Sequence, residues 1–525
     1  MVKTRSNSIW LRLAGLSVLG LALATPSMPP RPAVARTGQP SAPLPDVAVD
    51  PAVAAFYQAR AFEPLWVTGR EVVPAASQLL HVLERADRHG LDPSSYDLPL
   101  LRAALGRAAD GDRDAQAKAE LMLSNAYTRH MQALRRPAQA RSMRYVDAGL
   151  QPATPDASSL LADAAKAPSL ARHLAASEHL NPVYAGLVQG LEHYRANWGR
   201  LPQEPVPTGP LLKPGGNAAR IAALRRRLGL EPGTFDDTLS ERLRAFQATH
   251  ALPVTGLGDP ATLAALNRGA GPYERLIRAN MERARALPNL PTGRYVLVDT
   301  ASAQLWLVAN GRVVDRMKTV VGKSGMETPE MAGLIRYASW NPYWILPPDL
   351  IQQRARKVLR QGSGALAAER LQILSDWSPS ARPLKASQVN WSALAAGKRW
   401  VQLRQSPGAH NMMGRVKFMM PNNLGIYLHD TPTRALFDTA DRRHSSGCVR
   451  VEDAMRLARW LYGGSLPRTT GQPEERIDLP APVPVYIAYF TALPSKAGVV
   501  FARDVYRRDP ALLAGMGTAN APGRG

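Results

Sequence analysis

The sequence predicts an α+β protein with several domains: a helical domain, a small three-helix unit and a β-rich domain with an insert. Apolar residues recur at helical spacing through residues 50–200 and again through 215–270, whereas from about residue 290 they alternate in short runs typical of strands. Pro-rich segments at 36–49 and 201–214 favour extended linkers between these parts. A chain of 525 residues is long enough for about three domains.

The charge and the cysteine content narrow the class of protein. Lys and Arg number 65 against 42 Asp and Glu, and the net charge of +23 indicates attraction to polyanions. The cations are spread along the chain, and no zinc finger, RNA-binding signature or basic heptad is present, so nucleic acid is not the favoured partner. An Arg-rich composition explains the charge equally well. The single cysteine, Cys448, excludes an intrachain disulfide, a Cys-based zinc finger and an iron–sulfur cluster.

The first 35 residues have the three-part form of a secretory signal. Lys3, Arg5 and Arg12 form a positive start, an unbroken apolar run occupies 13–24, and small residues follow. As a helix this run would span about 18 Å, too short for a bilayer core of about 30 Å. We therefore expect a signal peptide over 1–35, either cleaved or retained as a membrane anchor, and an exported protein.

The helical domain over 50–200 contains no arrangement of residues typical of catalysis. Leu79, Leu80 and Leu83 recur at helical spacing, and Gly90 ends the run. His81 and His89 lie in a polar, Arg-rich segment, where solvated side chains are expected.

Residues 215–270 predict three short helices. Asp237 or Thr238 is expected to cap the second helix, and Thr262 begins the third. The segment resembles the three-helix peptidoglycan-binding module through the runs 224–229, 233–235 and 244–247.

The β-rich domain is expected over residues 290–508. Asn310-Gly311 lies between two apolar runs, which is a strong hairpin signal. Residues 348–400 interrupt the strands with a polar, partly helical insert. Residues 509–525, rich in Ala, Gly and Pro, are expected to form a flexible tail.

Cys448 is the residue with the most chemistry to explain. In an oxidising compartment a lone thiol is either buried and inert or exposed and reactive. A reactive thiol needs a base, a cation or a helix N-terminus nearby. We expect a helix over 452–462, so that Cys448 would lie just before its N-terminus, and a reactive thiol there should titrate well below 8.5.

His429, Gly447 and Arg450 could supply the rest of a nucleophilic site. His429 ends an apolar strand, which would aim its imidazole rigidly at a neighbouring loop. Gly447 permits close approach of a substrate carbonyl, and the backbone N–H groups of Gly447 and Cys448 could hold an oxyanion. Arg450 can offer a bidentate fork to a carboxylate.

Two other interpretations of these residues stay open. Cys448 could be a buried structural residue with incidental histidines nearby. His429, Asp430, His444 and Cys448 could instead bind a metal, but no compact repeated ligand pair supports that reading. We therefore expect no metal and no cofactor.

The run Ser-Ser-Gly-Cys-Val-Arg at 445–450, preceded by a strand histidine, resembles the signature of the L,D-transpeptidase (YkuD-type) catalytic domain. The runs at 339–344, 414–421 and 427–432 agree with it. Together with the helical scaffold and the module, the chain resembles the large periplasmic L,D-transpeptidases of Gram-negative bacteria over about residues 50–510; the scaffold residues that match include Phe56-Tyr57 and Pro64-Leu65-Trp66.

This resemblance implies roles for individual residues. Cys448 would be the nucleophile and His429 the general base, Gly447 with the Cys448 N–H the oxyanion hole, and Arg450 a residue that organises the site. The insert at 348–400 would be a capping subdomain. The residues that would contact substrate are Ser446, Tyr427, Trp340 and Trp344, although these aromatic residues could equally be core.

One departure from the family pattern concerns the histidine. The commoner motif has His immediately before Gly-Cys, where this sequence has Ser446, and His444 lies two residues earlier. We favour His429 over His444 as the base because His429 ends a strand and His444 lies in a loop.

The implied reaction is a peptidoglycan 3→3 cross-link between diaminopimelate residues, formed through a Cys thioester without a cofactor, in the periplasm. Water, a free D-amino acid or a lipoprotein lysine could replace the acceptor, giving a carboxypeptidase, an exchange enzyme or a lipoprotein-attachment enzyme. A non-catalytic wall-binding protein is the alternative from another class. In each case residues 215–270 would bind the sacculus.

Overall fold

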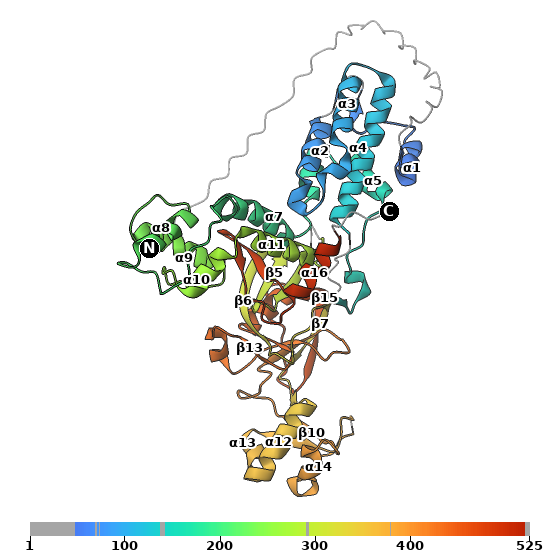
Figure 1. The fold of residues 1–525 in the computed structure, drawn as a ribbon. Coiled ribbons are helices and arrows are strands. Elements are labelled where there is room, and N and C mark those ends of the chain that lie inside the picture. The colour runs from blue at the N-terminus through green and yellow to red at the C-terminus, as the bar shows by residue number, and fades with distance from the viewer. Residues whose placement is uncertain are drawn as a thin grey trace, which may run out of the picture. The chain divides into compact units, whose positions relative to one another are not determined.

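The computed structural model describes residues 48–519 except 69–70, 73, 137–141, 290–292 and 379. The expected signal at 1–35 and nearly all of the linker at 36–49 lie outside the described residues. The described part is a mixture of helices and one large sheet, as the sequence predicts (Figure 1). No helix within it is long and apolar enough to cross a membrane.

The N-terminal part is helical, and aromatic side chains are buried within it. Trp66 and Tyr127 are fully buried there, with ring centroids 5.6 Å apart. Side chains of Asp112 and Asn181 cap two of its helices by accepting backbone N–H groups. The elements are α1 Pro51–Ala59, β1 Val67–Thr68, β2 Glu71–Val72, α2 Pro74–Glu84, α3 Leu98–Ala109, α4 Arg113–Leu134, α5 Ala157–Lys166, α6 Leu170–Ser177 and α7 Pro182–Tyr194.

Three short helices follow: α8 Ala218–Arg227, α9 Asp237–Thr249 and α10 Pro260–Asn267. The cap of α9 is Asp236, whose carboxylate accepts the Leu239 N–H, and not Asp237 or Thr238 as expected. The buried Gln247 amide joins the helices, because it donates to Thr255 and Thr262 and accepts the Gly256 N–H.

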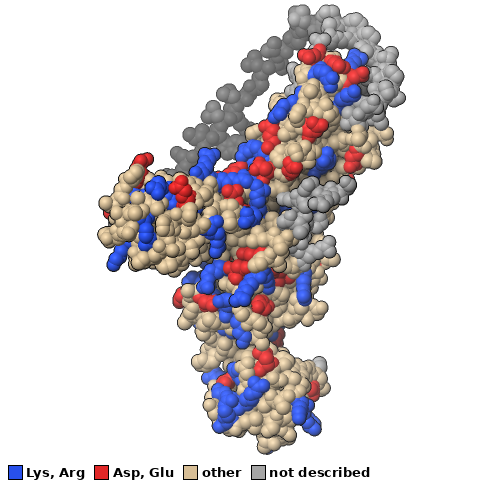
Figure 2. Space-filling view, in the orientation of Figure 1, with Lys and Arg blue, Asp and Glu red and all other residues tan. Residues whose placement is uncertain are grey.

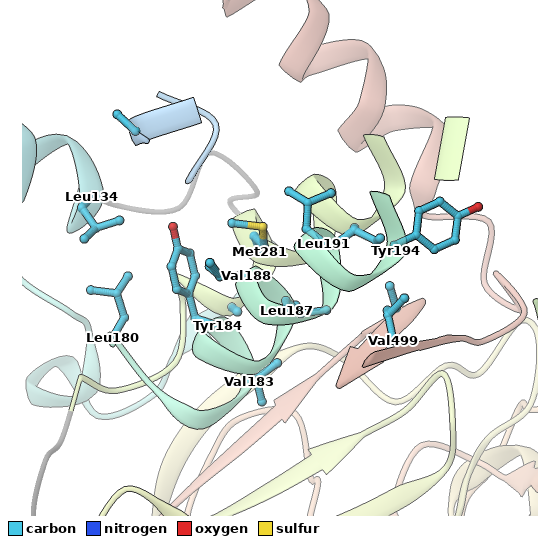
Figure 3. Packing of buried hydrophobic residues seen from close by; sticks show 14 of the residues in the cluster. Leu134, Leu180, Val183, Tyr184, Leu187, Val188, Leu191, Tyr194, Met281 and Val499 are labelled. Carbon is cyan, nitrogen blue, oxygen red and sulfur yellow. The ribbon is translucent and has the colours of Figure 1, made fainter. Parts of the chain in front are cut away.

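A further helix, α11 Ala270–Ala284, precedes the sheet and was not expected from the sequence. It packs with α7 and the C-terminal hairpin β16 Ala492–Ser495 and β17 Gly498–Phe501. Figure 3 shows α7 placing Leu187, Leu191 and Tyr194 into this core, with Met281 of α11 and Val499 of β17 beside them.

The sheet closes on itself. Its strands follow the order β11-β12-β14-β6-β5-β4-β15-β7, and β7 also pairs with β11. Asn310 and Gly311 both have positive φ and form the expected hairpin between β5 and β6. The bounds are β4 Arg294–Asp299, β5 Gln304–Ala309, β6 Arg312–Gly322, β7 Met331–Trp340, β11 Val416–Met419, β12 Leu428–His429, β13 Arg443–Ser445, β14 Val449–Val451 and β15 Glu475–Ala488, with α15 Ala454–Leu461 after β14.

A strand from the helical part joins this sheet. β3 Arg144–Tyr145 pairs in parallel with β7, at Met331 and Ala332. The Asp147 carboxylate accepts the Leu334 N–H at 2.9 Å. Residues that the sequence analysis assigns to the helical domain at 50–200 therefore add a short strand to this sheet.

The insert has a small core of its own, which includes Ile351, Ala355, Leu394 and Leu403. It extends beyond the expected 348–400, because strands on either side of that range complete a three-stranded sheet of order β8-β10-β9. The bounds are β8 Trp344–Ile345, α12 Pro348–Gln361, α13 Gly364–Ala368, β9 Leu371–Leu374, α14 Trp391–Ala395 and β10 Gln402–Gln405 (Figure 1).

The expected flexible tail from residue 509 is wrong over 509–519, where the structure has the helix α16 Asp509–Ala519. Asp509 is buried and its carboxylate pairs with Arg283 at 2.7 Å. An ion pair with a residue of α11 cannot be read from local composition, which explains the error. Residues 520–525 lie outside the described part.

Candidate active site

Two short parallel strands bring the residues of the sequence motif together. In β12 and β14, Leu428 lies opposite Val449 and His429 lies opposite Arg450. Leu428 and Val449 are fully buried in the core of the sheet. Because side chains alternate between faces of a strand, His429 and Arg450 lie on the other face. The alternation continues one residue beyond the pairing and brings Tyr427 and Cys448 to that same face.

Cys448 is half-buried, and its Sγ donates to the Gly425 carbonyl at 3.5 Å. Burial raises the pKa of the thiol, against the opposing effects of the Tyr427 N–H and hydroxyl and of the positive charges on Arg450 and Lys417. The thiol is thus neutral at neutral pH. Burial therefore acts against the low pKa that is expected of a reactive thiol.

The helix expected over 452–462 is present as α15, but it does not begin directly after Cys448. β14 follows it directly, α15 begins only at Ala454, and the Asp453 carboxylate caps α15 by accepting the Arg456 N–H. The influence expected from a helix N-terminus is therefore absent from the surroundings of Cys448.

The His429 imidazole is buried and is held in one tautomer. Its Nδ1 lies 2.6 Å from the Asp430 carbonyl oxygen, which can only accept, so Nδ1 carries the proton and Nε2 keeps its lone pair. Burial lowers the pKa of His429 to about 3, helped by the positive charges on Arg450 and Lys417. The imidazole is therefore neutral, and its lone pair is at Nε2.

Asp430 fixes the end of β12 and is not placed as a metal ligand. Its carboxylate accepts from Arg434 at 2.6 Å and from the Arg415 N–H at 2.9 Å. Gly414 has φ +59°, and a Cβ there would overlap the Asp430 carboxylate, so the close approach requires glycine. Within the described residues no group of three or more His, Cys, Asp or Glu could hold a metal ion.

Arg450 presents a guanidinium without a carboxylate partner. Its Nε is buried and makes no hydrogen bond, and none of the ion pairs formed by the described residues includes Arg450. Burial lowers the pKa of Arg450, opposed by Cys448. An unpaired guanidinium on the face that carries the thiol suits recognition of an anionic group.

Lys417 of β11 adds a second positive charge to this face, which the sequence analysis missed. It lies opposite His429 in the sheet and pairs with Glu474 at 3.1 Å. Its Nζ lies 6.0 Å from the centre of the Tyr427 ring. Lys417 is a polar residue between the apolar Val416 and Phe418, and this alternation could have predicted that it lies on the face of the sheet opposite the core.

The turn before Cys448 differs from the expected oxyanion hole. Gly447 has φ +114°, as its role at a close approach requires. Its N–H, however, donates to Ser445 Oγ at 3.2 Å. Ser445 also donates to the Cys448 carbonyl at 2.6 Å. The Gly447 N–H is therefore occupied, and Ser445, not the exposed Ser446, holds this turn.

The structure separates the expected groove residues. Tyr427 lies beside the site, its ring centre 5.7 Å from that of His429, and its pKa is raised by burial and by Cys448. Trp340 belongs to the buried core of the sheet, and Trp344 packs against the core of the insert. His444 is exposed, with its Nε2 bonded to the Asp441 carbonyl at 2.7 Å.

Three family models match parts of the chain. The "L,D-transpeptidase catalytic domain" matches residues 293–487, a "Scaffold domain" matches 51–191, and a "Putative peptidoglycan binding domain" matches 222–266. These matches confirm the resemblance seen in the sequence and assign the closed sheet, the first helices and α8–α10 to the three domains.

A protein of Haemophilus influenzae named "Putative L,D-transpeptidase" is 29% identical over 237 residues, which are 44% of this chain and 47% of that protein. The chain thus spans about half the length of this curated relative. Among solved structures, an L,D-transpeptidase from Mycobacterium smegmatis is 14% identical with a TM-score of 0.19, covering 37% of this chain and 59% of that one. An L,D-transpeptidase from Xylanimonas cellulosilytica is 16% identical with a TM-score of 0.17. The match covers 54% of this chain and 99% of that one.

Proposed function

We propose that this chain, which carries an L,D-transpeptidase catalytic domain beside a scaffold domain and a peptidoglycan-binding domain, forms 3→3 cross-links in peptidoglycan through a thioester on Cys448. The observation that carries the proposal is the shared face of β12 and β14. A half-buried thiol and a neutral imidazole lie there on adjacent strands, beside an unpaired guanidinium.

We infer general-base catalysis and not a preformed ion pair, because burial favours the neutral form of both groups. The pKa of Cys448 is raised and that of His429 is lowered, so both groups are neutral before substrate binds. The thiol proton therefore leaves as the sulfur attacks, and His429 Nε2 is the group that accepts it. The Asp430 carbonyl stabilises the resulting imidazolium through Nδ1–H.

The first half-reaction breaks one amide and forms one thioester. Cys448 Sγ attacks the carbonyl of diaminopimelate, the third residue of a donor tetrapeptide stem, and the carbonyl oxygen becomes an oxyanion. The Cys448 N–H binds this oxygen. When the tetrahedral intermediate collapses, His429 returns its proton to the nitrogen of the departing D-Ala, which leaves as a free amino acid.

The second half-reaction restores the enzyme. The side-chain amine of diaminopimelate in an acceptor stem attacks the thioester carbonyl and gives up a proton to His429. The Cys448 sulfur then leaves and takes that proton from the imidazole. One amide has been exchanged for another, so the cross-link needs no nucleotide and no other source of energy.

Electrostatics support an anionic substrate. Stem peptides carry carboxylates, and the Arg450 guanidinium would bind one of them with both of its terminal nitrogens. Figure 2 shows Lys and Arg scattered over the visible face of each part of the molecule, in keeping with the net charge of +23. We assign the chain to the periplasm, exported by the signal at 1–35 and bound to the sacculus through residues 215–270.

Mass spectrometry of the protein incubated with tetrapeptide muropeptides tests this function. A cross-linked dimer with release of D-Ala is the expected product, and Cys448→Ala should abolish it while leaving sacculus binding intact. The substitution removes the 3.5 Å contact with Gly425 and the contact with the Tyr427 hydroxyl, both next to the site, so the fold should persist. Dimer formed by Cys448→Ala would refute the nucleophile. Tripeptide alone would indicate a carboxypeptidase, and sacculus binding without any product would indicate a non-catalytic wall protein.

A further inference from the structure

A buried hydroxyl ties the loop that carries Cys448 to the interior of the sheet. Thr328 is fully buried, and its Oγ1 accepts the Gly322 N–H at 2.9 Å. The same hydroxyl donates to the Gly447 carbonyl at 2.7 Å. Because a threonine hydroxyl has one proton to donate, this proton is committed to the Gly447 carbonyl.

The Gly447 carbonyl and the Cys448 N–H belong to one peptide unit. In a planar trans peptide the C=O and the N–H point in opposite directions. With the carbonyl fixed toward Thr328, the Cys448 N–H points away from Thr328. Among the hydrogen bonds found in the described part of the chain, none has this N–H as its donor.

The N–H of the preceding peptide unit is not free to bind an oxyanion. The Gly447 N–H is bonded to Ser445 Oγ at 3.2 Å, so of the two N–H groups next to the Gly447 carbonyl and the thiol, that of Cys448 is the open one. Its direction then depends on how firmly the Gly447–Cys448 peptide is held.

The loop that carries Thr328 is held in place by contacts with the end of β6. A Cβ on Gly322 would overlap the backbone of Met326 and Thr328, so the loop packs directly against the end of β6. The Tyr506 hydroxyl donates to the Gly322 carbonyl at 2.5 Å, and the Lys323 N–H donates to the Ser445 carbonyl at 2.9 Å. The support for Thr328 therefore comes from the domain interior and exists before substrate binds.

We infer that Thr328 is a positioning residue for acyl transfer: by holding the Gly447 carbonyl it aims the Cys448 N–H at the oxygen that becomes an oxyanion. The inference rests on the proposed function, because it concerns the same thiol. Displacing a group near the reacting atoms by about 1 Å can cost about 100-fold in rate. Loss of one oxyanion donor costs about 10²- to 10³-fold.

Two reactions of the same sulfur separate this role from a structural one. Acylation by p-nitrophenyl acetate passes through an oxyanion, whereas alkylation by iodoacetamide occurs at a saturated carbon and forms none. Thr328→Val keeps the shape and removes the hydroxyl. We expect its acylation rate constant to fall about 10- to 100-fold while alkylation changes little. Thr328→Ser should restore acylation.

Thr319→Val is the matched control. Thr319 is a fully buried residue of β6 whose Oγ1 has no hydrogen-bond partner, so its loss should leave both reactions unchanged. Thr328→Ala, which also removes the hydroxyl and adds no second thiol, should likewise slow acylation more than alkylation and serves if the valine variant does not fold.

Equal losses of acylation and alkylation in Thr328→Val would show a merely structural role, and undiminished acylation would overturn the inference. Failure of the proposed function looks different. In that case the wild-type protein would be alkylated at Cys448 but would be acylated neither by the ester nor by muropeptides.

Discussion

His429 lies directly opposite Arg450 across the parallel pair β12–β14, so a neutral imidazole and an unpaired guanidinium share one face of the sheet. The positive charge of Arg450 helps to lower the pKa of His429 and opposes the burial that raises the pKa of Cys448. One residue thus acts on the pKa of both groups, and among the described residues it has no carboxylate partner.

Arg450→Gln should reduce kcat/KM for tetrapeptide donors about 10- to 100-fold, since a charged hydrogen bond contributes about 1.5–3 kcal/mol. The loss should appear mainly in KM, because the guanidinium would bind a carboxylate in both ground and transition states. Arg450→Lys should recover only part of it, as an ammonium cannot form the bidentate pair. Arg312→Gln, at an exposed position at the start of β6, is the control, and an equal loss there would contradict the assignment.

The free protein should be alkylated slowly at neutral pH and faster as the pH rises above the ordinary thiol pKa, because burial favours the neutral thiol. Iodoacetamide alkylation of Cys448 followed by mass spectrometry across a pH series measures this. Arg450→Gln should move the profile to still higher pH. A plateau reached below pH 7 would instead indicate a preformed thiolate–imidazolium pair.

Gly447→Ala should inactivate the site. At φ +114° a residue with a Cβ is strained, and this Cβ would lie 3.2 Å from Ile426 Cδ1. We expect the unfolding free energy to fall by about 1–3 kcal/mol and acylation of Cys448 to fall much more. Gly425→Ala, also at positive φ but with open space around its Cβ, separates backbone strain from crowding. Normal acylation in Gly447→Ala would contradict the geometry of this turn.

Stability should decline in acid because buried histidines stay neutral in the fold. His250 stacks on Phe246 with ring centres 3.8 Å apart, and burial lowers its pKa to about 4. The unfolded chain takes up a proton near pH 6.5 and the folded one does not until about pH 4, so folding stability is lost as the pH falls through that window.

At pH 5 the loss from His250 should be about 2 kcal/mol relative to pH 7. Urea unfolding at the two pH values measures it. His250→Gln should flatten the dependence, although its stability at pH 7 falls because stacking is lost. The exposed His179 provides the control, since His179→Gln should leave the dependence unchanged. An unchanged slope in His250→Gln would contradict the prediction.

The helix α9 and the hairpin at Asn310-Gly311 could be predicted because their signals are local: helical spacing of apolar residues and a turn whose backbone needs positive φ. His429 and Cys448 could be predicted as candidates for the same reason. The end of an apolar strand and a cysteine that follows a glycine can both be recognised from a few neighbouring residues. The cap of α9 was misplaced by one residue because several polar residues compete there.

The sequence by itself determined which kinds of domain and which candidate residues the protein has. There are three kinds of domain, one thiol, a histidine at the end of a strand, and an arginine two residues beyond the thiol. Pairing between distant segments decided the rest. Only the register of β12 with β14 places His429 and Arg450 on one face. Only the tertiary structure bonds the Gly447 N–H to Ser445 and buries Trp340 in the core. It also brings the Thr328 hydroxyl to the Gly447 carbonyl. These contacts join residues up to 119 positions apart, and no local pattern encodes which partner a buried polar group will find.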